Sequence, residues 1–343
     1  MEGSDRYVVQ RMIAGLVAVS LAVTACSPGG ATSPSTANTA SSSGSVASCV
    51  PSSSSAGSYA SASTAAGADA PALLVLAACE DGTPRLWSLD AKGGWTTLGS
   101  IPGGEAIARD DATITIARSG SLETRSVARP GATLATLVLK WPGSVPTAPI
   151  RAIDSSPSGS TAIVTADEHG QTYSIASPDG IVNPLTGAPE SSFAPLFDWI
   201  DANRALALSE GTDATSRIVV LTPQTGGSEA ISTLLGVRWL ALSRDRSTVA
   251  VALDAGIYVS PVSALLNGEQ PAWVGSLGPS QSVLDLVVDQ TGDHLAALVT
   301  STRADGTSDN IRELSFSKTN SGWTRTYDAP VPFATALGQV WLG

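Results

Sequence analysis

Short apolar runs separated by polar turns recur along the chain between residues 71 and 343. Each unit begins with a strand-like segment, a polar turn and a second, more apolar segment. A glycine-bearing turn and a segment that alternates between apolar and polar residues follow. Runs of this length bounded by turn residues are typical of β-strands. The opening segments of the four clearest units are residues 149–153, 195–200, 237–242 and 282–288.

A fourth strand is expected to close each unit, often with a tryptophan: Trp95, Trp141, Trp273 and Trp323. Two weaker copies, residues 73–101 and 107–140, precede the four clear ones. The glycine-bearing turns recur about every 45 residues, which is the length of a four-stranded propeller blade. We therefore predict an all-β fold, a β-propeller of six blades. A seventh, incomplete blade is one alternative, and a β-sandwich or two smaller domains is another.

The two ends of the repeat region complement each other. The first copy shows only three strands, whereas the chain ends in an unassigned strand at residues 336–342. If this C-terminal strand joins the first blade as its inner strand, the ring closes and no sheet edge stays open there. We predict this closure.

Composition supports short strands and limits the choice of partners. The chain is 43% hydrophobic, 14% charged and 5% aromatic, with 33 Gly and 21 Pro, which suits strands and turns better than helices. The formal net charge of −11 disfavours nucleic acid and anionic lipid headgroups. Basic or neutral partners are easier to bind, and we expect no nucleic-acid partner.

The N-terminal residues 1–25 have the pattern of a signal peptide. Arg6 and Arg11 precede an uncharged, largely apolar run at residues 12–25. Fourteen helical residues reach about 21 Å, short of the ~30 Å hydrocarbon core, which disfavours a permanent spanning helix.

The end of that run resembles the lipobox of bacterial lipoproteins, in the sequence Val-Thr-Ala-Cys at residues 23–26. The resemblance implies that Cys26 carries diacylglycerol and becomes the mature N-terminus. Two or more acyl chains hold a protein on a membrane without further apolar surface. The alternative is an ordinary secretory signal with a cysteine nearby by chance.

Residues 26–70 are rich in Ser, Thr, Ala and Gly and almost free of charge, so we expect a disordered linker. Its typical reach is about 35–40 Å. The predicted organisation is a signal peptide at 1–25, the lipidated cysteine and linker at 26–70, and a propeller at 71–343. Of the three cysteines, Cys49 and Cys79 are left as a disulfide pair in an oxidising compartment, or as two unpaired thiols.

The polar turns and the strands after them carry a family resemblance. The segments SSPSGSTAIVTA, SRDRSTVAVAL and DQTGDHLAALV resemble the WD40-like repeats of TolB-type periplasmic propellers, and the propeller half of actinobacterial propeller lipoproteins. The resemblance implies the fold and says little of the function, because propellers host many unrelated activities. This chain has no recognisable counterpart of the N-terminal partner domain of these families.

Inner strands of a propeller line its channel, so charged residues on them are candidate site residues. We predict a polar funnel formed by Arg151, Asp154, Asp198, Arg238 and Asp285. The alternative is channel solvation and salt bridging between blades.

Other catalytic or cofactor chemistry has little support in the sequence. The two histidines, His169 and His294, lie in or beside polar turns without metal-ligand spacing, and no G-x-S-x-G motif occurs. We predict no catalytic residues, no metal and no cofactor. Trp199 and Trp239 fall on inner strands, where packing between blades is expected more than carbohydrate stacking.

The sequence thus favours a monomeric, non-catalytic binding or scaffold module, exported and lipid-anchored at the outer face of the cytoplasmic membrane. A protein or a cell-envelope ligand is its expected partner. The alternative is an extracytoplasmic propeller enzyme that acts on glycans or lactones through inner-strand carboxylates.

Overall fold

The structure is a computed structural model, and it describes residues 73–90, 93–110, 112–167, 170–187, 196–210, 215–231, 234–302 and 311–341. All of these belong to one compact unit. They form the strands β1 to β24 and one five-residue helix, α1, which confirms the all-β prediction. The signal peptide at 1–25, Cys26, Cys49 and the linker lie outside the described residues.

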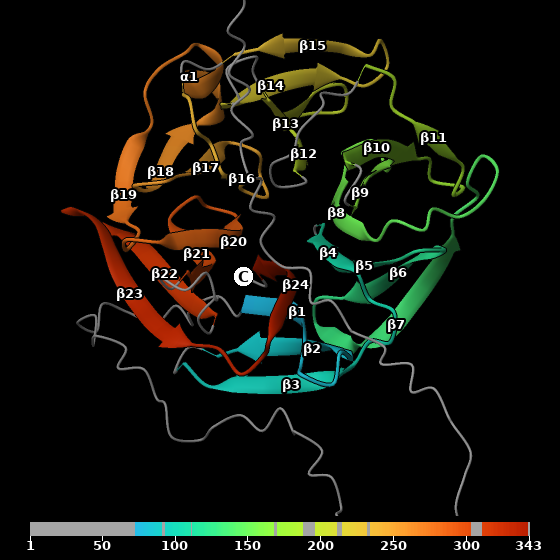
Figure 1. The fold of residues 1–343 in the computed structure, drawn as a ribbon, viewed down its shortest axis with the longest axis horizontal. Coiled ribbons are helices and arrows are strands. Elements are labelled where there is room, and N and C mark those ends of the chain that lie inside the picture. The colour runs from blue at the N-terminus through green and yellow to red at the C-terminus, as the bar shows by residue number, and fades with distance from the viewer. Residues whose placement is uncertain are drawn as a thin grey trace, which may run out of the picture. The chain divides into compact units, whose positions relative to one another are not determined.

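The strands form six four-stranded antiparallel sheets arranged as the blades of a propeller (Figure 1). Each blade runs outward from an inner strand. Blade 1 contains β24 (Thr335–Trp341), β1 (Leu73–Ala78), β2 (Pro84–Leu89) and β3 (Trp95–Ser100); blade 2 contains β4 (Ala106–Arg109), β5 (Thr113–Arg118), β6 (Ser121–Ser126) and β7 (Arg129–Val138); blade 3 contains β8 (Ile150–Ser155), β9 (Thr161–Asp167), β10 (Gly170–Ala176) and β11 (Val182–Pro184).

The second half of the ring repeats this order. Blade 4 contains β12 (Phe197–Trp199), β13 (Ala205–Glu210), β14 (Ser216–Thr222) and β15 (Gly227–Ala230); blade 5 contains β16 (Trp239–Leu242), β17 (Thr248–Leu253), β18 (Gly256–Pro261) and β19 (Ala272–Ser276); blade 6 contains β20 (Gln281–Val288), β21 (His294–Ser301), β22 (Arg312–Thr319) and β23 (Gly322–Pro330).

The C-terminal strand closes the ring, as the sequence predicted. β24 pairs antiparallel with β1, from Leu73 opposite Trp341 to Ala78 opposite Thr335, with a register shift between Leu76 and Ala77. Blade 1 therefore takes its inner strand from one end of the propeller sequence and its other three from the opposite end. Figure 1 shows β24 beside β1 near the centre of the ring.

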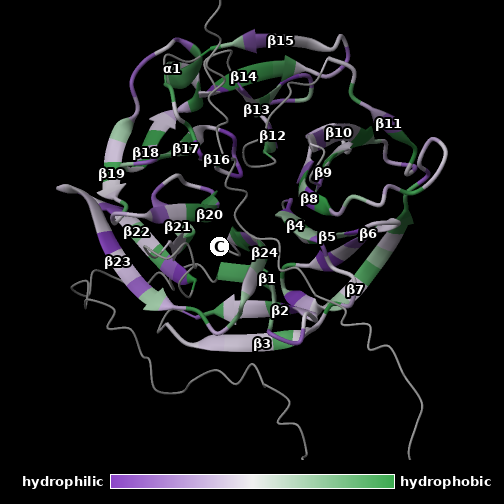
Figure 2. Ribbon diagram, viewed as in Figure 1, coloured by the Kyte–Doolittle hydropathy of each residue, from purple (hydrophilic) through white to green (hydrophobic). Residues whose placement is uncertain are grey.

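The second strand of each blade is the most buried part of the fold. All six residues of β1 are buried, and β5, β9, β13, β17 and β21 are buried through most of their length. Both faces of such a strand lie against neighbouring blades, which explains why these segments read as continuous apolar runs rather than alternating ones. Figure 2 shows the contrast between the hydrophobic β1 and the more hydrophilic outer strand β23.

Successive residues of a second strand pack into different inter-blade clusters. Leu73 and Val75 of β1 belong to the cluster shared with blade 6, whereas Leu74 and Leu76 belong to the cluster shared with blade 2. The described residues contain six such clusters, one between each pair of adjacent blades, including the seam between blades 6 and 1. The hydrophobic core is thus a closed circuit of six interfaces.

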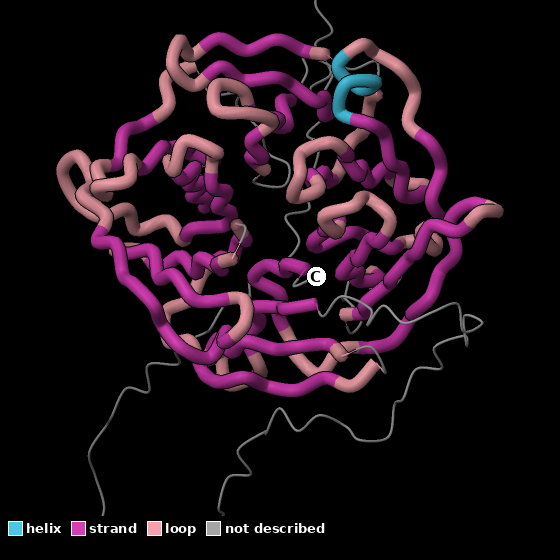
Figure 3. The backbone as a smooth tube through the Cα atoms, turned by 180° about the vertical axis from the view of Figure 1, so that it is seen from behind, coloured by secondary structure: helices cyan, strands magenta, loops and turns pink. Residues whose placement is uncertain are grey.

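Two details differ from the sequence prediction. A short helix, α1 (Val262–Leu266), follows β18, where the sequence pattern indicated only a loop; Val262 and Leu265 are buried and pack into the cluster between blades 4 and 5. Figure 3 shows this single helix at the rim of the ring. Trp141 lies beyond the outer strand of blade 2, because β7 ends at Val138, and its indole donates to the carbonyl of Ser119 over 3.1 Å.

Two observations bear on the predicted membrane attachment and disulfide. Among the described residues, no helix has the length and apolar character needed to cross a bilayer. Cys79 follows β1 and is buried in the seam between blades 6 and 1, where Arg85 Nη1 donates to its Sγ over 3.4 Å. Because Cys49 lies outside the described residues, the Cys49–Cys79 bridge stays a prediction.

Candidate functional site

Four of the five predicted funnel residues lie on inner strands, and the three aspartates among them interact electrostatically. Asp154 is on β8, Asp198 on β12 and Asp285 on β20, and all three side chains are half-buried. Asp198 experiences the charges of both Asp154 and Asp285. The alternation of side chains along each strand therefore turns these carboxylates to the same region around the propeller axis.

Each of these carboxylates also connects its blade to the next one. Asp154 Oδ2 accepts a hydrogen bond from the backbone N–H of Trp199, in blade 4, over 2.7 Å. Asp198 accepts from Leu242 N–H in blade 5, and Asp285 accepts from Gln339 N–H in blade 1. Glu105, just before β4, does the same for Ile150 of blade 3 over 2.6 Å. The carboxylates thus satisfy backbone donors that inner strands would otherwise leave unpaired.

Burial raises the pKa of Asp154 to about 7, against the opposing effects of the Trp199 hydrogen bond and the positive charge of Arg246. The pKa of Asp198 is raised well above its ordinary value, first by burial and next by the charge of Asp154. Two neighbouring carboxylates that are both partly withdrawn from water do not ionise independently.

Asp285 and Glu313 form a second acidic pair, in blade 6. Burial raises the pKa of Asp285 to about 7, although N–H groups of Leu286, Gln339 and the Trp239 indole all donate to it. Glu313 on β22 is fully buried, and its pKa is raised well above the ordinary value by burial and by the charge of Asp285. Its Oε2 has no hydrogen-bond partner among the described residues. A protonated, neutral Glu313 is the form that this environment favours.

Arg246 is the cation of this region, and it was not among the residues predicted from the sequence. It lies in the turn between β16 and β17 of blade 5. Its Nε donates to the carbonyl of Trp199 over 2.9 Å, and its Nη2 donates to the carbonyl of Ser155 over 2.7 Å. One side chain thus joins blades 3, 4 and 5. We call Asp154, Asp198, Asp285 and Arg246 the axial cluster.

The backbone of Arg246 is unusual for its residue type. Its φ is +60°, and its N–H donates to Ser243 O. Glycine takes the same place in the equivalent turns of blades 3 and 6, where Gly159 has φ +84° and Gly292 has φ +74°. A non-glycine residue in the left-handed region is strained and is retained where its surroundings compensate. An arginine at this glycine position of the repeat was the sequence signal for it.

The two predicted arginines lie apart from the axial cluster. Arg238 precedes β16 and forms an ion pair with Asp254 after β17, with Nε and Oδ1 2.8 Å apart. Arg151 is exposed at the second position of β8, three residues before Asp154. Because β16 runs from Trp239 to Leu242, Arg238 and Arg246 lie beyond opposite ends of one strand. The predicted five-residue funnel is therefore divided in space.

His294 is less exposed than its position beside a polar turn indicated. His294 begins β21 and is half-buried; its Nδ1 lies 2.9 Å from Ser317 Oγ, and its ring lies 6.4 Å from that of Trp341. Trp341, on β24 of blade 1, thus partly covers the His294 ring. His169 lies outside the described residues, and in the part that the structure describes no three His, Cys, Asp or Glu residues are grouped to hold a metal.

Comparisons with known proteins address the fold. No family model matches the sequence, and no curated protein matches it. Among solved structures, TolB from Acinetobacter baumannii has a TM-score of 0.53 at 10% identity and covers 80% of this chain and 67% of its own. A TolB-type protein from Agrobacterium tumefaciens has a TM-score of 0.46 at 12% identity, covering 76% of this chain and 90% of its own.

A gluconolactonase from Xanthomonas campestris is also among the similar structures, with a TM-score of 0.43 at 14% identity, covering 68% of this chain and 84% of its own. At these identities the likeness concerns the fold alone. The chain has a TolB-like propeller fold, and proteins of this architecture differ in activity.

Replacing Arg246 tests its role in the axial cluster. Because the guanidinium lowers the pKa of Asp154 and Asp198, Arg246→Gly should raise the pKa of Asp154 above about 7, measured by the pH dependence of its ¹³Cγ shift. Arg246→Ala should be less stable than Arg246→Gly by ~1 kcal/mol, since alanine retains the left-handed strain. Arg204→Gln, at an exposed ion pair with Asp201, should leave the Asp154 titration unchanged. An unaltered Asp154 titration in Arg246→Gly would contradict the assignment.

Glu313 should make the fold less stable as pH rises. Its folded pKa is raised, so the unfolded chain loses this proton first. The stabilisation that protonated Glu313 contributes is complete below the pKa of Glu313 in the unfolded chain. Above that pH, the free energy of unfolding declines by up to about 1.4 kcal/mol per pH unit until the pKa of Glu313 in the folded protein is passed. Glu313→Gln should remove this part of the decline in urea unfolding between pH 5 and pH 9, whereas the exposed Glu229→Gln should not. Equal pH profiles for the wild type and Glu313→Gln would show that Glu313 is not held protonated.

Proposed function

We propose that this protein is an exported, lipid-anchored propeller that acts as a non-catalytic binding module, and that its axial cluster receives a basic segment of a partner protein or another cationic cell-envelope ligand. The observation that carries the proposal is that all three axial aspartates already accept backbone hydrogen bonds from the next blade. Carboxylates held in this way form a rigid acidic surface, and they remain half-exposed to an incoming group.

The charge state of the cluster supports a cationic ligand. Asp154 and Asp285 titrate in the neutral pH range, since the pKa of each is about 7. A positive group beside them favours the ionised forms, so its binding is coupled to proton release. The net charge of −11 acts in the same direction by attracting basic partners over longer distances.

The lipid anchor and the location are part of the same proposal. The apolar run at 12–25 and Cys26 match the lipobox pattern, and the linker at 26–70 would hold the propeller about 35–40 Å from the membrane. A module at that height can reach partners at the membrane surface or in a surrounding wall layer.

One observation favours the enzyme alternative. Carboxyl groups with a pKa of about 7 are suited to general acid–base catalysis at neutral pH, and Asp154 and Asp285 meet that condition. Glycans or lactones would be the substrates of such an enzyme. The backbone hydrogen bonds of Asp154 and Asp285, however, already hold both carboxyl groups in place.

A double variant tests the binding proposal. Asp154→Asn/Asp198→Asn removes two acidic groups but retains an oxygen that accepts the Trp199 and Leu242 N–H bonds. In quantitative capture from native membranes, the full chain should retain a partner that this variant loses by about tenfold or more, because a buried charge contact is removed. Retention by the wild type should also increase from pH 6 to pH 8.

The control variant is Glu229→Gln/Glu269→Gln, which replaces two acidic side chains by amides at exposed positions and should capture as the wild type does. Identical partners and amounts for all three proteins would rule out binding through the axial cluster. Hydrolysis of glycosides or lactones by the wild type and its loss in the double variant would instead support the enzyme.

The anchor has its own test. Cys26→Ala should release the exported chain from the membrane fraction into the medium, because the acyl chains supply the membrane affinity. Mass spectrometry of the wild type should find a lipid-modified N-terminal peptide that begins at Cys26. A Cys26→Ala protein that stays with the membrane, together with an unmodified wild-type cysteine, would contradict the proposed anchor.

A further inference from the structure

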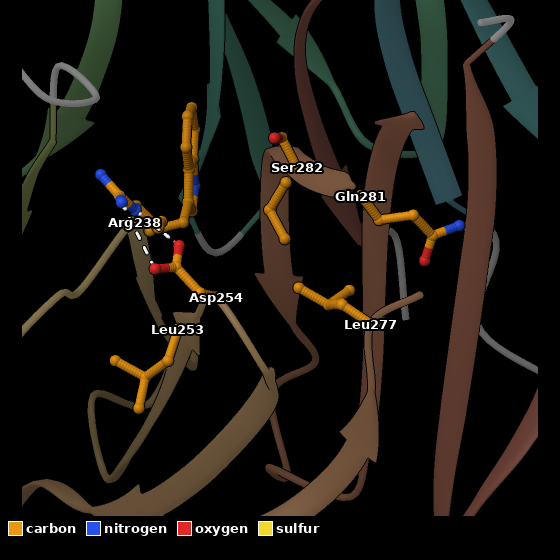
Figure 4. Close-up of a pocket in the computed structure, with 8 residues that line it drawn as sticks. Arg238, Leu253, Asp254, Leu277, Gln281 and Ser282 are labelled. Carbon is orange, nitrogen blue, oxygen red and sulfur yellow. Dashed lines mark hydrogen bonds and ion pairs between the residues drawn. The ribbon is translucent and has the colours of Figure 1, made fainter. Parts of the chain in front are cut away.

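A pocket of about 280 Å³ lies between blades 5 and 6 and borders the axial cluster through Trp239, whose indole donates to Asp285. The start of β16, the end of β17 and the start of β20 line it, so two blades contribute to its walls. In Figure 4, Arg238 and Asp254 stand on one side, and Ser282 and Leu277 stand on the other. The pocket is at the opposite end of β16 from the turn that carries Arg246.

The charged wall of the pocket is electrically balanced. Arg238 Nε is 2.8 Å from Asp254 Oδ1, and Nη2 is 3.4 Å from Oδ2, a two-pronged pairing. The two side chains are 48% and 74% exposed, so the pair contributes little to stability. A charged ligand would be attracted by one member of the pair and repelled by the other, so the pair gives neither charge a net advantage. A neutral ligand that both donates and accepts hydrogen bonds matches the pair best.

An apolar wall lies beside the Arg238–Asp254 ion pair. Leu253, Leu277 and Val283 supply an apolar surface, and Trp239 adds an aromatic ring. The ring is fixed, because its indole N–H donates to Asp285 and it packs against the clusters on both sides of blade 5. The volume is near the lower end of the ~300–1,000 Å³ range of small-molecule sites, which suits a ligand of one or two rings.

We propose that this pocket binds a neutral saccharide. A sugar ring has an apolar C–H face for Trp239 and the leucines, and adjacent hydroxyls that can donate to Asp254 and accept from Arg238 at the same time. Ser282 offers a further hydroxyl at the exposed side. Trp239 connects this pocket to Asp285, but none of the four axial-cluster side chains lines the pocket, so the proposal stands without the function proposed for that cluster.

Binding to simple sugars tests it directly. The full chain, in a non-glycosidic detergent such as lauryldimethylamine oxide, is titrated with N-acetylglucosamine and cellobiose and with the charged analogues glucuronate and glucosamine. Ligand-observed NMR should give saturable binding of a neutral sugar at Kd around 1 mM, a value typical of a few polar contacts and one small apolar face. The charged analogues should bind at least about fivefold more weakly, because the balanced ion pair offers their charge no net attraction to offset its loss of hydration.

Two variants should shift the preference in opposite directions. Asp254→Asn removes the carboxylate that pairs with Arg238 and should make glucuronate the preferred ligand, whereas Arg238→Gln should favour glucosamine. The control is Arg312→Gln, which breaks another partly exposed pair, with Asp328 outside the pocket, and should leave every Kd within about twofold of the wild type. Absence of saturable binding to any neutral sugar, or affinities that both pocket variants leave unchanged, would overturn the proposal.

Discussion

The packing of each second strand against two neighbouring blades is the interaction on which the rest of the structure depends. In β1, Leu73 and Val75 face blade 6 while Leu74 and Leu76 face blade 2, so one short strand contributes to two hydrophobic interfaces. In an open row of blades, each end blade would expose one of these faces to water. Only a closed ring buries both faces of every blade, which makes the pairing of β24 with β1 a condition for stability and not an addition to it.

Closure also explains why acidic residues occur near the centre. The inner strand of each blade has backbone N–H groups on its free edge, where no further strand supplies carbonyl acceptors. Asp154, Asp198 and Asp285 each accept a hydrogen bond from one such N–H group of the next blade. The same burial raises the pKa of all three groups. The positive charge of Arg246 partly offsets the effect of burial on Asp154 and Asp198. Its backbone is strained, and its side chain binds carbonyl groups of two other blades. The features that make this region a candidate site are thus consequences of how the blades are joined.

The sequence predicted the fold well because the apolar second strands and the glycine turns repeat at a regular spacing, and because a strand was missing at one end and left over at the other. It also selected the three aspartates, whose inner-strand positions follow from the repeat. It missed Arg246, since the bonds that define its role reach residues 47 and 91 positions away. It placed Arg238 with the wrong neighbours for a similar reason: Asp254, its partner, lies across a β-hairpin and not along the axis.

Native-state hydrogen exchange tests the closed ring most directly. The account predicts that the hydrogen-bonded amides of β24 (Thr335–Trp341) exchange together with those of β1 and of the second strands of the other blades, through one global unfolding event. The slowest amides would then respond to denaturant with the same slope in all six blades. Fast exchange of β24 at a rate typical of a fraying terminus, with β5, β9, β13, β17 and β21 still protected, would contradict it.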